Sequence, residues 1–563
     1  MNIKPKLKTI TFKDSGEIDK SDALILTIVF LMFLCVIYFN PRLLSLLVGE
    51  EPFFAKISVI IFVISLDMMW LYGIYHCAHI VFSYFFKTKI FPKKLNPDFS
   101  PAVAVLYMTR NDFSEQACIT CINQDYKNYQ VYICDDSDDQ TAQKKIDAFV
   151  KNNKINVQIL RRRSNRGYKA GNINDALKSI DEKYQYVAVA DADSIFPEYF
   201  LKKIMPYFTA SSKIAFVQAM QKSLKNQKGY LGKTMLSMVD IHWQHYMTLK
   251  NQYGFVMWYG HGAVLKRSII EEIGGIPEVV TEDLSFSSKV RGLGYYGVVA
   301  GDVESVEEFP ETLEKFRRRN RKWVRGTYEY LRRLYPQILF SKKIPWFEKA
   351  DIFISAFALL QAIPFLMLVF TASFIMPFYY AKYQINGPLF LVPPLFYDDW
   401  LQVILKTRYN VFWLLDFYII MLIVIFFPLI PAVIDMWSNK RKMLRYIAAS
   451  SFLHLSILLD SAKEVIMFIV TGKTYFPVTN NQFSRQENKV WLAVEFMTGI
   501  YLMIFAVWTY NLWLVALGMA FVLTPLLIAW GERRLIQILV TIPFTVTAVI
   551  MICIGVTIIQ NIR

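Results

Sequence analysis

Cysteine is scarce in this chain, which has six cysteines among 563 residues. A fold stabilised by disulfides needs a framework of paired cysteines, so that class is not expected. Cys118 and Cys121 have the spacing of a redox or metal motif, but no second pair accompanies them. We interpret them as small apolar residues on a buried helix face. Four of the six histidines form two i, i+3 pairs without nearby carboxylates, and we interpret those as structural too.

Charge is missing from long stretches of the sequence. Charged residues make up 19% of the chain and hydrophobic residues 54%, with a mean hydropathy of +0.30. The charged residues are concentrated between about residues 87 and 350, and the flanking runs nearly lack them. This distribution predicts a membrane protein with one large polar domain.

The uncharged runs predict the membrane spans, because a helix needs about 20 apolar residues to cross a bilayer core. We expect seven spans, two before the polar domain and five after it. They lie at 23–39, 57–86, 352–381 and 417–434, in two helices within 496–530 that turn back near 509–511, and at 535–562. The segment 1–20 has five lysines and no apolar core of a signal peptide, so the first span is expected to remain as an anchor.

Clusters of Lys and Arg mark the cytoplasmic side of a membrane. They place the polar domain in the cytoplasm of a multi-pass protein of the plasma (inner) membrane, and 443–470, with its internal charges, as a helix lying in the membrane plane. The predicted divisions are a cytoplasmic N-terminus (1–22), two spans (23–86), the cytoplasmic domain with interfacial helices (87–350), two spans (351–436), a cytoplasmic interfacial helix with a loop (437–489) and three spans (490–563).

The formal net charge of +16 raises the question of nucleic-acid binding. No zinc spacing and no RNA-binding signature accompanies the charge. Basic residues beside a membrane that contact anionic lipid explain much of the excess. We therefore expect the lipid bilayer as a partner and no nucleic acid.

Apolar runs and helical stretches alternate in the polar domain. The runs lie at 102–108, 130–134, 156–160, 186–190 and 214–219, and helical patterns separate them at 114–123, 140–151, 169–179 and 197–208. This alternation predicts an α/β fold with a mostly parallel sheet and helices on both faces. Ligands of such folds bind at the carboxyl ends of the strands.

Polar clusters follow four of these predicted strands. They include Thr109 with Asn111, Asp135 with Asp136, Arg161 to Arg163 leading to Lys169, and Asp191 with Asp193. Two carboxylates one residue apart at the end of a buried strand repel each other unless a divalent cation lies between them. Asp191 and Asp193 therefore predict a site for Mg²⁺ or Mn²⁺ that holds a diphosphate.

The other clusters complete a nucleotide site. Asp135 and Asp136 can accept hydrogen bonds from a base or ribose, although this pair alone is equally well explained as a solvated turn. Lys169 lies near the start of a helix, where a phosphate meets both its charge and the positive end of the helix dipole.

Two further segments have a functional and a structural interpretation. Thr281 is either an N-cap with acidic residues behind it or the start of a site in which Asp283 is a general base. The stretch 315–333 holds nine Lys or Arg and one acidic residue. Its cations can stabilise a departing diphosphate and Trp323 can stack on a sugar, but an interfacial helix that faces lipid has a similar composition.

These motifs, in this order, resemble the membrane-embedded processive family 2 glycosyltransferases, which include cellulose, chitin, hyaluronan and curdlan synthases. The resemblance covers most of 100–335 and implies a GT-A-like domain and a UDP-sugar donor. It implies that Asp135 or Asp136 contacts the uridine, Asp193 binds the metal with Asp191 near the diphosphate, Asp283 beside Glu282 is the catalytic base, and Trp323 stacks on the acceptor. It also implies that Phe476, Val478 and Thr479 belong to a loop that covers the bound nucleotide.

The chain departs from the family pattern at several positions. The usual Q-x-x-R-W motif is replaced by one with Arg319 and Lys322, which retains a basic residue but loses the glutamine. Arg321 adds a further cation, and the Arg-rich run is somewhat similar to transferases that make osmoregulated periplasmic glucans. The loop after Thr479 lacks the usual lysine, and no cyclic-dinucleotide-binding domain is expected after the last span.

The expected function is therefore polymerisation. A processive, inverting glycosyltransferase would build a β-linked polysaccharide, a β-glucan as first choice, from a UDP-sugar and pass the growing polysaccharide through its own membrane channel. Two alternatives stay open. One is a non-processive enzyme that transfers a sugar to a lipid carrier or short acceptor, and the other is a transporter without catalysis, which would be expected to carry internal repeats that are not evident here.

Overall fold

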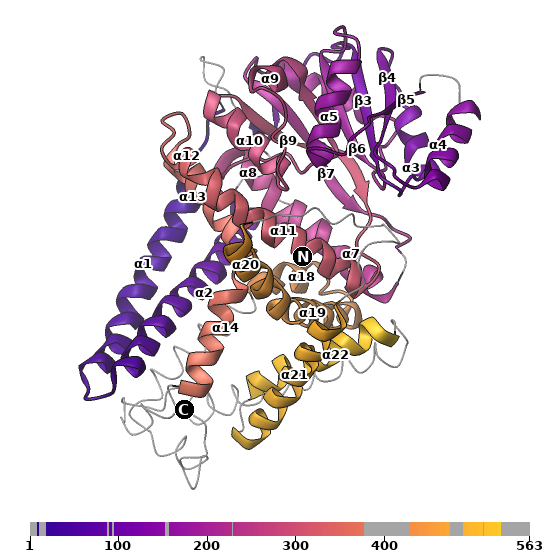
Figure 1. Cartoon of the computed structure of the whole chain (residues 1–563). Helices are drawn as coiled ribbons and strands as arrows, with labels where there is room; N and C mark the ends of the chain where they lie inside the picture. Colours follow the sequence, from indigo (N-terminus) through magenta and orange to yellow (C-terminus); the bar gives the residue numbers. More distant parts are fainter. Residues whose placement is uncertain are drawn as a thin grey trace.

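The protein has two parts, a sheet domain and a group of long helices that extend away from it (Figure 1). The computed structural model describes residues 8–10, 18–86, 89–92, 95–152, 157–227, 229–375, 427–472, 488–509 and 512–530. The loop residues Phe476, Val478 and Thr479 lie outside the described residues, as do most of the predicted span 417–434 and all of 535–562.

The sheet has seven strands in the order β5-β4-β3-β6-β8-β7-β9. In chain order they are β3 (Val103–Thr109), β4 (Tyr129–Asp135), β5 (Val157–Arg161), β6 (Tyr186–Asp191), β7 (Ile214–Ser223), β8 (Ala263–Lys266) and β9 (Tyr296–Glu307). Only β8 runs antiparallel to its neighbours in this sheet. The expected mostly parallel sheet is confirmed, whereas β8 and β9 were not predicted. A separate short sheet pairs β1 (Lys8–Ile10) with β2 (Lys89–Pro92).

Helices cover both faces of this sheet because both faces are apolar. All seven residues of β3 are buried, and alternate side chains join two different core clusters. One face packs on α3 (Glu115–Ile122), α4 (Gln140–Asn152) and α6 (Phe200–Ile204), and the other on α5 (Tyr168–Ser179), α9 (Arg267–Glu272) and α10 (Glu282–Leu293). Cys118 and Cys121 are fully buried free thiols of α3, which confirms their structural role.

The parallel strands are in register at their carboxyl ends. Thr109 of β3 pairs with Asp135 of β4, which in turn pairs with Arg161 of β5. Asp191 of β6 lies opposite Met108, one residue before the end of β3. The polar side chains that follow these strands consequently lie along one edge of the sheet.

The described residues contain three helices that are long and apolar enough to cross a membrane, or four if one bent pair forms a single span. The three are Ala23–Val48, which includes α1 (Ala23–Leu44), α2 (Phe53–Phe85), and Lys489–Ala506 of α21 (Lys489–Thr509). In the bent pair, α13 (Trp346–Phe357) meets the helix Ala362–Ile375, which contains α14 (Ala362–Phe370), at 62°.

The expected count of seven spans is therefore corrected to three or four over the described part of the chain. The predicted span 352–381 is broken by the bend between α13 and α14. The predicted turn within 496–530 is present, because α21 is followed by α22 (Leu512–Trp530), but the apolar part of α22 is too short to count as a full span. A Cβ on Gly499 would lie 2.7 Å from the carbonyl oxygen of Gly518, so the two helices pack closely there.

Several further helices complete the described part of the chain. They are α7 (Tyr230–His242), α8 (Thr248–Tyr253), α11 (Leu313–Arg333), α12 (Tyr335–Leu339), α18 (Ile430–Asp435), α19 (Lys440–Ser456) and α20 (Leu458–Thr471). The single in-plane helix expected over 443–470 is in fact two helices, α19 and α20, with a break at Ile457.

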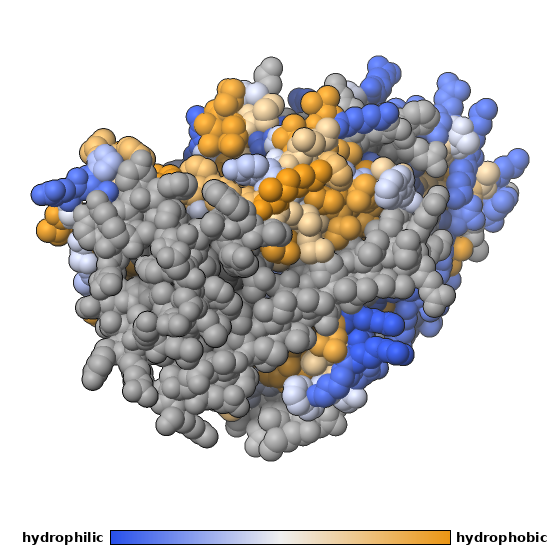
Figure 2. Space-filling model, turned by 90° about the horizontal axis from the view of Figure 1, so that it is seen from below, coloured by the Kyte–Doolittle hydropathy of each residue, from blue (hydrophilic) through white to orange (hydrophobic). Residues whose placement is uncertain are grey.

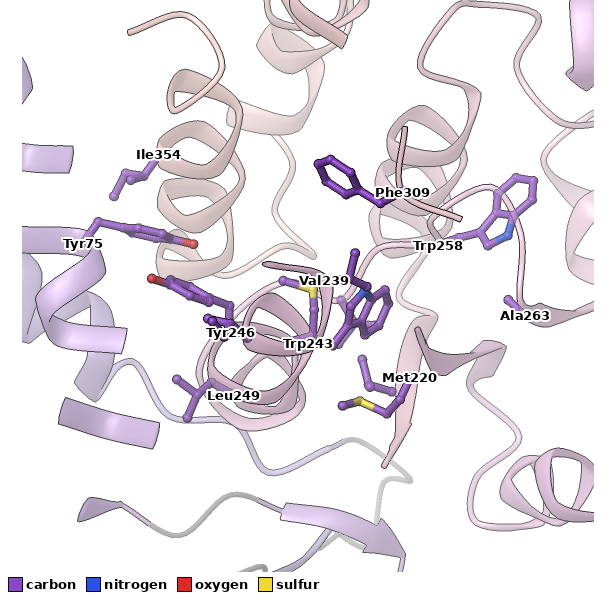
Figure 3. Packing of buried hydrophobic residues seen from close by; sticks show 14 of the residues in the cluster. Tyr75, Met220, Val239, Trp243, Tyr246, Leu249, Trp258, Ala263, Phe309 and Ile354 are labelled. Carbon is purple, nitrogen blue, oxygen red and sulfur yellow. The ribbon is translucent and has the colours of Figure 1, made fainter. Parts of the chain in front are cut away.

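One core joins the sheet domain to the membrane helices. Figure 3 shows Tyr75 of α2 opposite Tyr246, and Trp243 near Met220 of β7. These four residues belong to one cluster of buried side chains that extends from α1 to the sheet. The sheet domain is thus packed on the helices rather than tethered to them by a linker.

The described membrane helices expose apolar side chains. Figure 2 views the molecule from below, and among the coloured residues hydrophobic ones gather in one region with hydrophilic ones along the edges. On α1 the exposed apolar side chains include Leu26, Val29, Phe30, Phe33, Leu34 and Ile37. An exposed apolar face of this extent fits contact with lipid.

Candidate active site

Asn111 joins the loops that follow β3 and β4. Its backbone has a positive φ of 63°, and its N–H donates to the Ser137 hydroxyl at 2.9 Å. Its side-chain oxygen accepts from the N–H of Asp138 at 3.1 Å. The buried Thr109 hydroxyl donates to Asp112 at 2.9 Å. Both predicted substrate ligands therefore lie at the expected edge of the sheet, where they also shape the loops.

Asp135 and Asp136 are buried, so their interpretation as a solvated turn is wrong. Arg161 Nε donates to Asp135 at 2.6 Å. Arg162 donates to both oxygens of Asp136, through Nε at 2.7 Å and Nη2 at 2.6 Å. A bidentate guanidinium fixes the plane of a carboxylate. Recognition of a nucleoside by this pair stays a prediction.

Lys169 connects the end of β6 to the loop before β8. Its ammonium group pairs with Asp191 and donates to the Gly260 carbonyl oxygen at 2.8 Å. Burial lowers the pKa of Lys169, but the carboxylates of Asp191, Glu282 and Asp283 outweigh it and the net shift is upward. The side chain is therefore a permanent cation beside three carboxylates.

Asp191 and Asp193 have opposite pKa shifts. Burial raises the pKa of Asp191, but Lys169 and His261 outweigh it and hold the pKa below its usual value. Burial, and next the nearby charge of Asp191, raises the pKa of Asp193 to about 7. A cation at Asp193 would offset this cost, because it favours the ionised carboxylate.

The residues present fit a divalent cation that is completed by its substrate. Among the residues that the structure describes, no group of three or more His, Cys, Asp or Glu forms a metal site. The carboxylate oxygens of Asp193 and Asp191 are hard ligands of the kind that Mg²⁺ and Mn²⁺ prefer, and Mg²⁺ usually takes one or two carboxylates together with phosphate oxygens.

Glu282 and Asp283 form the first turn of α10. Thr281 makes no capping hydrogen bond with its side chain; its hydroxyl donates to the Gly326 carbonyl oxygen of α11 at 3.3 Å. Thr281 therefore occupies the N-cap position of α10 with acidic residues in the first turn, as one of the two interpretations expected, but its side chain does not cap the helix. Burial raises the pKa of Glu282 to about 7 and also raises the pKa of Asp283, while Lys322 and Lys169 partly offset both shifts.

Gly260 lies where these groups converge. A Cβ on this residue would lie 3.5 Å from Lys169 Nζ, 3.8 Å from Asp283 Oδ2 and 3.9 Å from Glu282 Oε1. Its φ of +85° is one that favours glycine. The structure thus brings together Lys169, Asp191, Glu282 and Asp283, which are far apart in the sequence.

Only some of the predicted site residues of the basic helix α11 lie near the carboxylates beside Gly260. Lys322 is partly buried, and its charge acts on Glu282, Asp191 and Asp283. Arg319 acts on Glu307 and Asp193, and its guanidinium lies 4.6 Å from the centre of the Trp323 ring.

Arg321 faces another way. Arg321 pairs with Asp460 of α20 at 2.5 Å, so the structure does not bring it to the carboxylates of the candidate active site. Its predicted role as a substrate ligand stays a prediction. Trp323 is 41% exposed, which leaves one side of the indole accessible.

The loop 259–262 was missed from the sequence. Within it His261 bonds to the Ser194 hydroxyl at 3.1 Å and lies 3.5 Å from Glu307. The buried Gln218 holds this loop by accepting from the N–H of Tyr259 at 2.9 Å and donating to the carbonyl oxygens of residues 261 and 262. Two glycines that flank a histidine just before an apolar run were the available signal.

Comparisons with known proteins agree with these motifs. Residues 117–326 match the family model described as "Glycosyltransferase like family 2". A glucomannan 4-beta-mannosyltransferase 1 of Cyamopsis tetragonoloba is 26% identical over 206 residues, which are 36% of this chain and 39% of that protein. A probable glucomannan 4-beta-mannosyltransferase 6 of Oryza sativa subsp. japonica is 27% identical over 201 residues, 35% of this chain and 34% of that protein. The matched segment thus spans well under half of these relatives.

Solved structures are similar at a lower level. A mannosyltransferase PcManGT from Pyrobaculum calidifontis, in complex with GDP-Man and Mn²⁺, is 16% identical, with 56% of this chain and 85% of that chain covered and a TM-score of 0.43. TarS 1–349 of S. aureus is 14% identical, with 68% and 98% covered and a TM-score of 0.31.

The convergence at Gly260 predicts the effect of one methyl group. We expect Gly260→Ala to lower glycosyl transfer by about 10-fold, because the added Cβ lies in van der Waals contact with Lys169 and Asp283 and fills space beside the two charged groups that the substrate would use. The matched control is Gly274→Ala, which has a similar φ of +80° but nothing within 4 Å of its Cβ. Both variants carry the same backbone strain, so equal transfer rates in the two purified proteins would contradict the assignment.

Proposed function

We propose that this family 2 glycosyltransferase is a membrane enzyme that polymerises a β-linked polysaccharide from a nucleotide sugar, with a β-glucan from UDP-glucose as first choice. One observation carries the proposal. Two lysines from different helices converge with Asp191, Glu282 and Asp283 beside Gly260 at the carboxyl edge of the sheet. This arrangement offers cations for a diphosphate next to a carboxylate suited to take a proton.

The donor would lie along the edge of the sheet. The buried Asp135 and Asp136 at the end of β4 are assigned to the nucleoside, with Thr109 and Asn111 shaping the loop beside them. Lys169, in the first turn of α5, is assigned to the diphosphate, since a helix N-terminus and an ammonium group both attract phosphate.

A divalent metal, Mg²⁺ or Mn²⁺, would be held by Asp193 with Asp191 and would supply positive charge to the diphosphate oxygens. The chain's own cations act on the same charge. Lys322 and Arg319 of α11 are assigned to stabilise the departing nucleoside diphosphate, because both act electrostatically on this group of carboxylates.

The reaction is a single displacement. Asp283 takes the proton from a hydroxyl of the terminal acceptor sugar, and that oxygen forms a bond to the anomeric carbon. The bond from this carbon to the diphosphate oxygen breaks, and the nucleoside diphosphate leaves with the electron pair. Attack from the face opposite to the leaving group inverts an α-linked donor to a β-linked product.

The acceptor would meet the exposed face of Trp323, beside which the Arg319 guanidinium stacks. The domain is packed on membrane helices through a shared core, which supports synthesis at the cytoplasmic membrane surface and passage of the polymer through the helices. The donor is open between glucose and mannose, because the curated relatives are named as mannosyltransferases.

We expect Asp283→Asn to lower polymer synthesis by about 10²- to 10⁴-fold while the affinity for nucleoside diphosphate stays the same, because only the proton acceptor is removed. The measurement is incorporation of radiolabelled UDP-glucose, and in parallel GDP-mannose, into product sized by gel filtration. Asp125→Asn is the control, since Asp125 forms an exposed ion pair with Lys202 before β4. Unchanged synthesis by Asp283→Asn would refute the assignment of Asp283 as the general base.

The size of the product tests processivity separately. A single lipid-linked sugar in place of long chains would refute it.

The activity should fall on the acidic side of neutral pH. Since burial raises the pKa of Asp283 and brings that of Glu282 to about 7, the ionised base is lost as pH decreases through these raised values. Lys322 lowers both pKa values, so Lys322→Met should shift the acidic limb of the kcat profile to higher pH. Lys315→Met is the control on the same helix, because Lys315 pairs with Glu311 instead. If the acidic limb does not shift in Lys322→Met, the charge of Lys322 does not act on the catalytic carboxylates.

Transfer should also require a divalent cation. Excess chelator is expected to abolish activity, and added Mn²⁺ or Mg²⁺ to restore it, because Asp193 and Asp191 would repel the anionic diphosphate unless a cation lies between them. Full activity of the purified protein in excess chelator would contradict the assignment of Asp193 as a metal ligand.

A further inference from the structure

The basic helix α11 carries charged side chains on two faces. Arg319 and Lys322 act on carboxylates of the candidate active site, and Trp323 lies against the Arg319 guanidinium. Arg317, Arg321 and Arg325 follow one another at intervals of four residues, so they share a different face of the helix. Figure 1 shows α11 directly above α20 and between the sheet domain and the membrane helices.

The second face is bound to acidic residues of α20 and α21. Arg321 Nε donates to Asp460 of α20 at 2.5 Å. Arg317 donates to Glu495 of the apolar helix α21 at 2.7 Å, and Arg325 lies 2.6 Å from Glu464. The contacts thus extend along three turns of α11.

These pairs are buried. The side chains of Arg317 and Asp460 are fully inaccessible and Glu495 is 1% exposed. Between the pairs, Asn320 donates to the Ser461 hydroxyl at 2.8 Å. Buried ion pairs are costly to desolvate and so contribute little net stability, but each partner strongly disfavours any arrangement that leaves it unpaired.

The same helix is held from the other side by the start of α10. The Thr281 hydroxyl donates to the Gly326 carbonyl oxygen, and a Cβ on Gly326 would lie 2.8 Å from Thr281 Cγ2. The turn that carries Glu282 and Asp283 therefore rests on α11. A rotation of α11 by one residue, about 100°, would move Lys322 away from those carboxylates and Arg321 away from Asp460 together.

We propose that Asp460, with Glu464 and Glu495, is a positioning residue: it fixes the rotation of α11 so that Lys322 and Trp323 stand at the reacting groups. The inference rests on the proposed function. It makes transfer depend on α20 and α21 being assembled beneath the sheet domain. The acidic side chains themselves do not touch substrate and act through α11.

The first test is Asp460→Asn, which keeps the shape of the side chain and removes its charge. We expect kcat to fall by about 10²-fold, as a displacement of about 1 Å can do, while KM for the nucleotide sugar changes less than threefold because Lys169, Asp135 and Asp136 are untouched. Asp460→Glu should recover part of the rate. Glu314→Gln is the matched control, since Glu314 forms a partly exposed i, i+4 pair with Arg318 on α11 itself.

The second test restores the position of α11 without restoring the charge of residue 460. Asn320→Cys and Ser461→Cys replace two side chains in direct contact, so oxidation can join α11 to α20 by a disulfide in the Asp460→Asn background. We expect oxidation to raise kcat toward the wild-type value and reduction to reverse it. The same oxidant acting on Asp460→Asn without the added cysteines is the control. Size-exclusion elution and thermal unfolding of every variant report whether it is folded.

The outcomes separate the two proposals. No transfer by the wild-type protein with any nucleotide sugar would refute the proposed function. An active wild-type protein together with an equally active Asp460→Asn, or a folded, cross-linked Asp460→Asn that stays inactive, would refute the positioning role alone.

Discussion

The site depends on two lysines that keep several carboxylates together at a partly buried position. Asp191, Glu282 and Asp283 come from two different elements, and each acts electrostatically on both Lys169 and Lys322. Like charges a few ångströms apart in a partly desolvated site repel by several kcal/mol, with about 4 kcal/mol at 4 Å as a representative value. The lysines offset part of this repulsion, and the pKa values of Asp193 and Glu282 still rise to about 7, with burial as the largest cause.

The fold supplies this arrangement through strand register. Because β3, β4, β5 and β6 are parallel and end together, their following loops meet at one edge. Lys169 reaches that edge from the helix after β5, and the loop with Gly260 reaches it from the antiparallel strand β8. The antiparallel strand is what brings Gly260 to the end of β6, since a parallel strand would place the residue before it at the opposite edge.

Much of this arrangement could be predicted from the sequence, because continuous apolar runs bounded by polar residues are a local signal. The first five strands of the sheet domain, β3 to β7, and the acidic pairs after β4 and β6 were recognisable in this way. β8 was not, since its four residues are too few to show a pattern, and the role of Gly260 depends on neighbours that are close only after folding. The span prediction differs from the described residues for a related reason: hydropathy identified the apolar run 352–381 but carries no information on the 62° bend within it.

The basic helix is the most instructive case. Its composition equally fits a helix that lies on lipid, in which the arginines would be exposed to headgroups. Arg317 is instead fully buried and Arg325 nearly so, against acidic residues of α20 and α21. Asp460 and Glu464 are four residues apart, as are Arg321 and Arg325, so the sequence did contain matching charge intervals on two helices. Composition alone could not reveal that match, because the charges pair only if the two helices are known to pack side by side with these faces together.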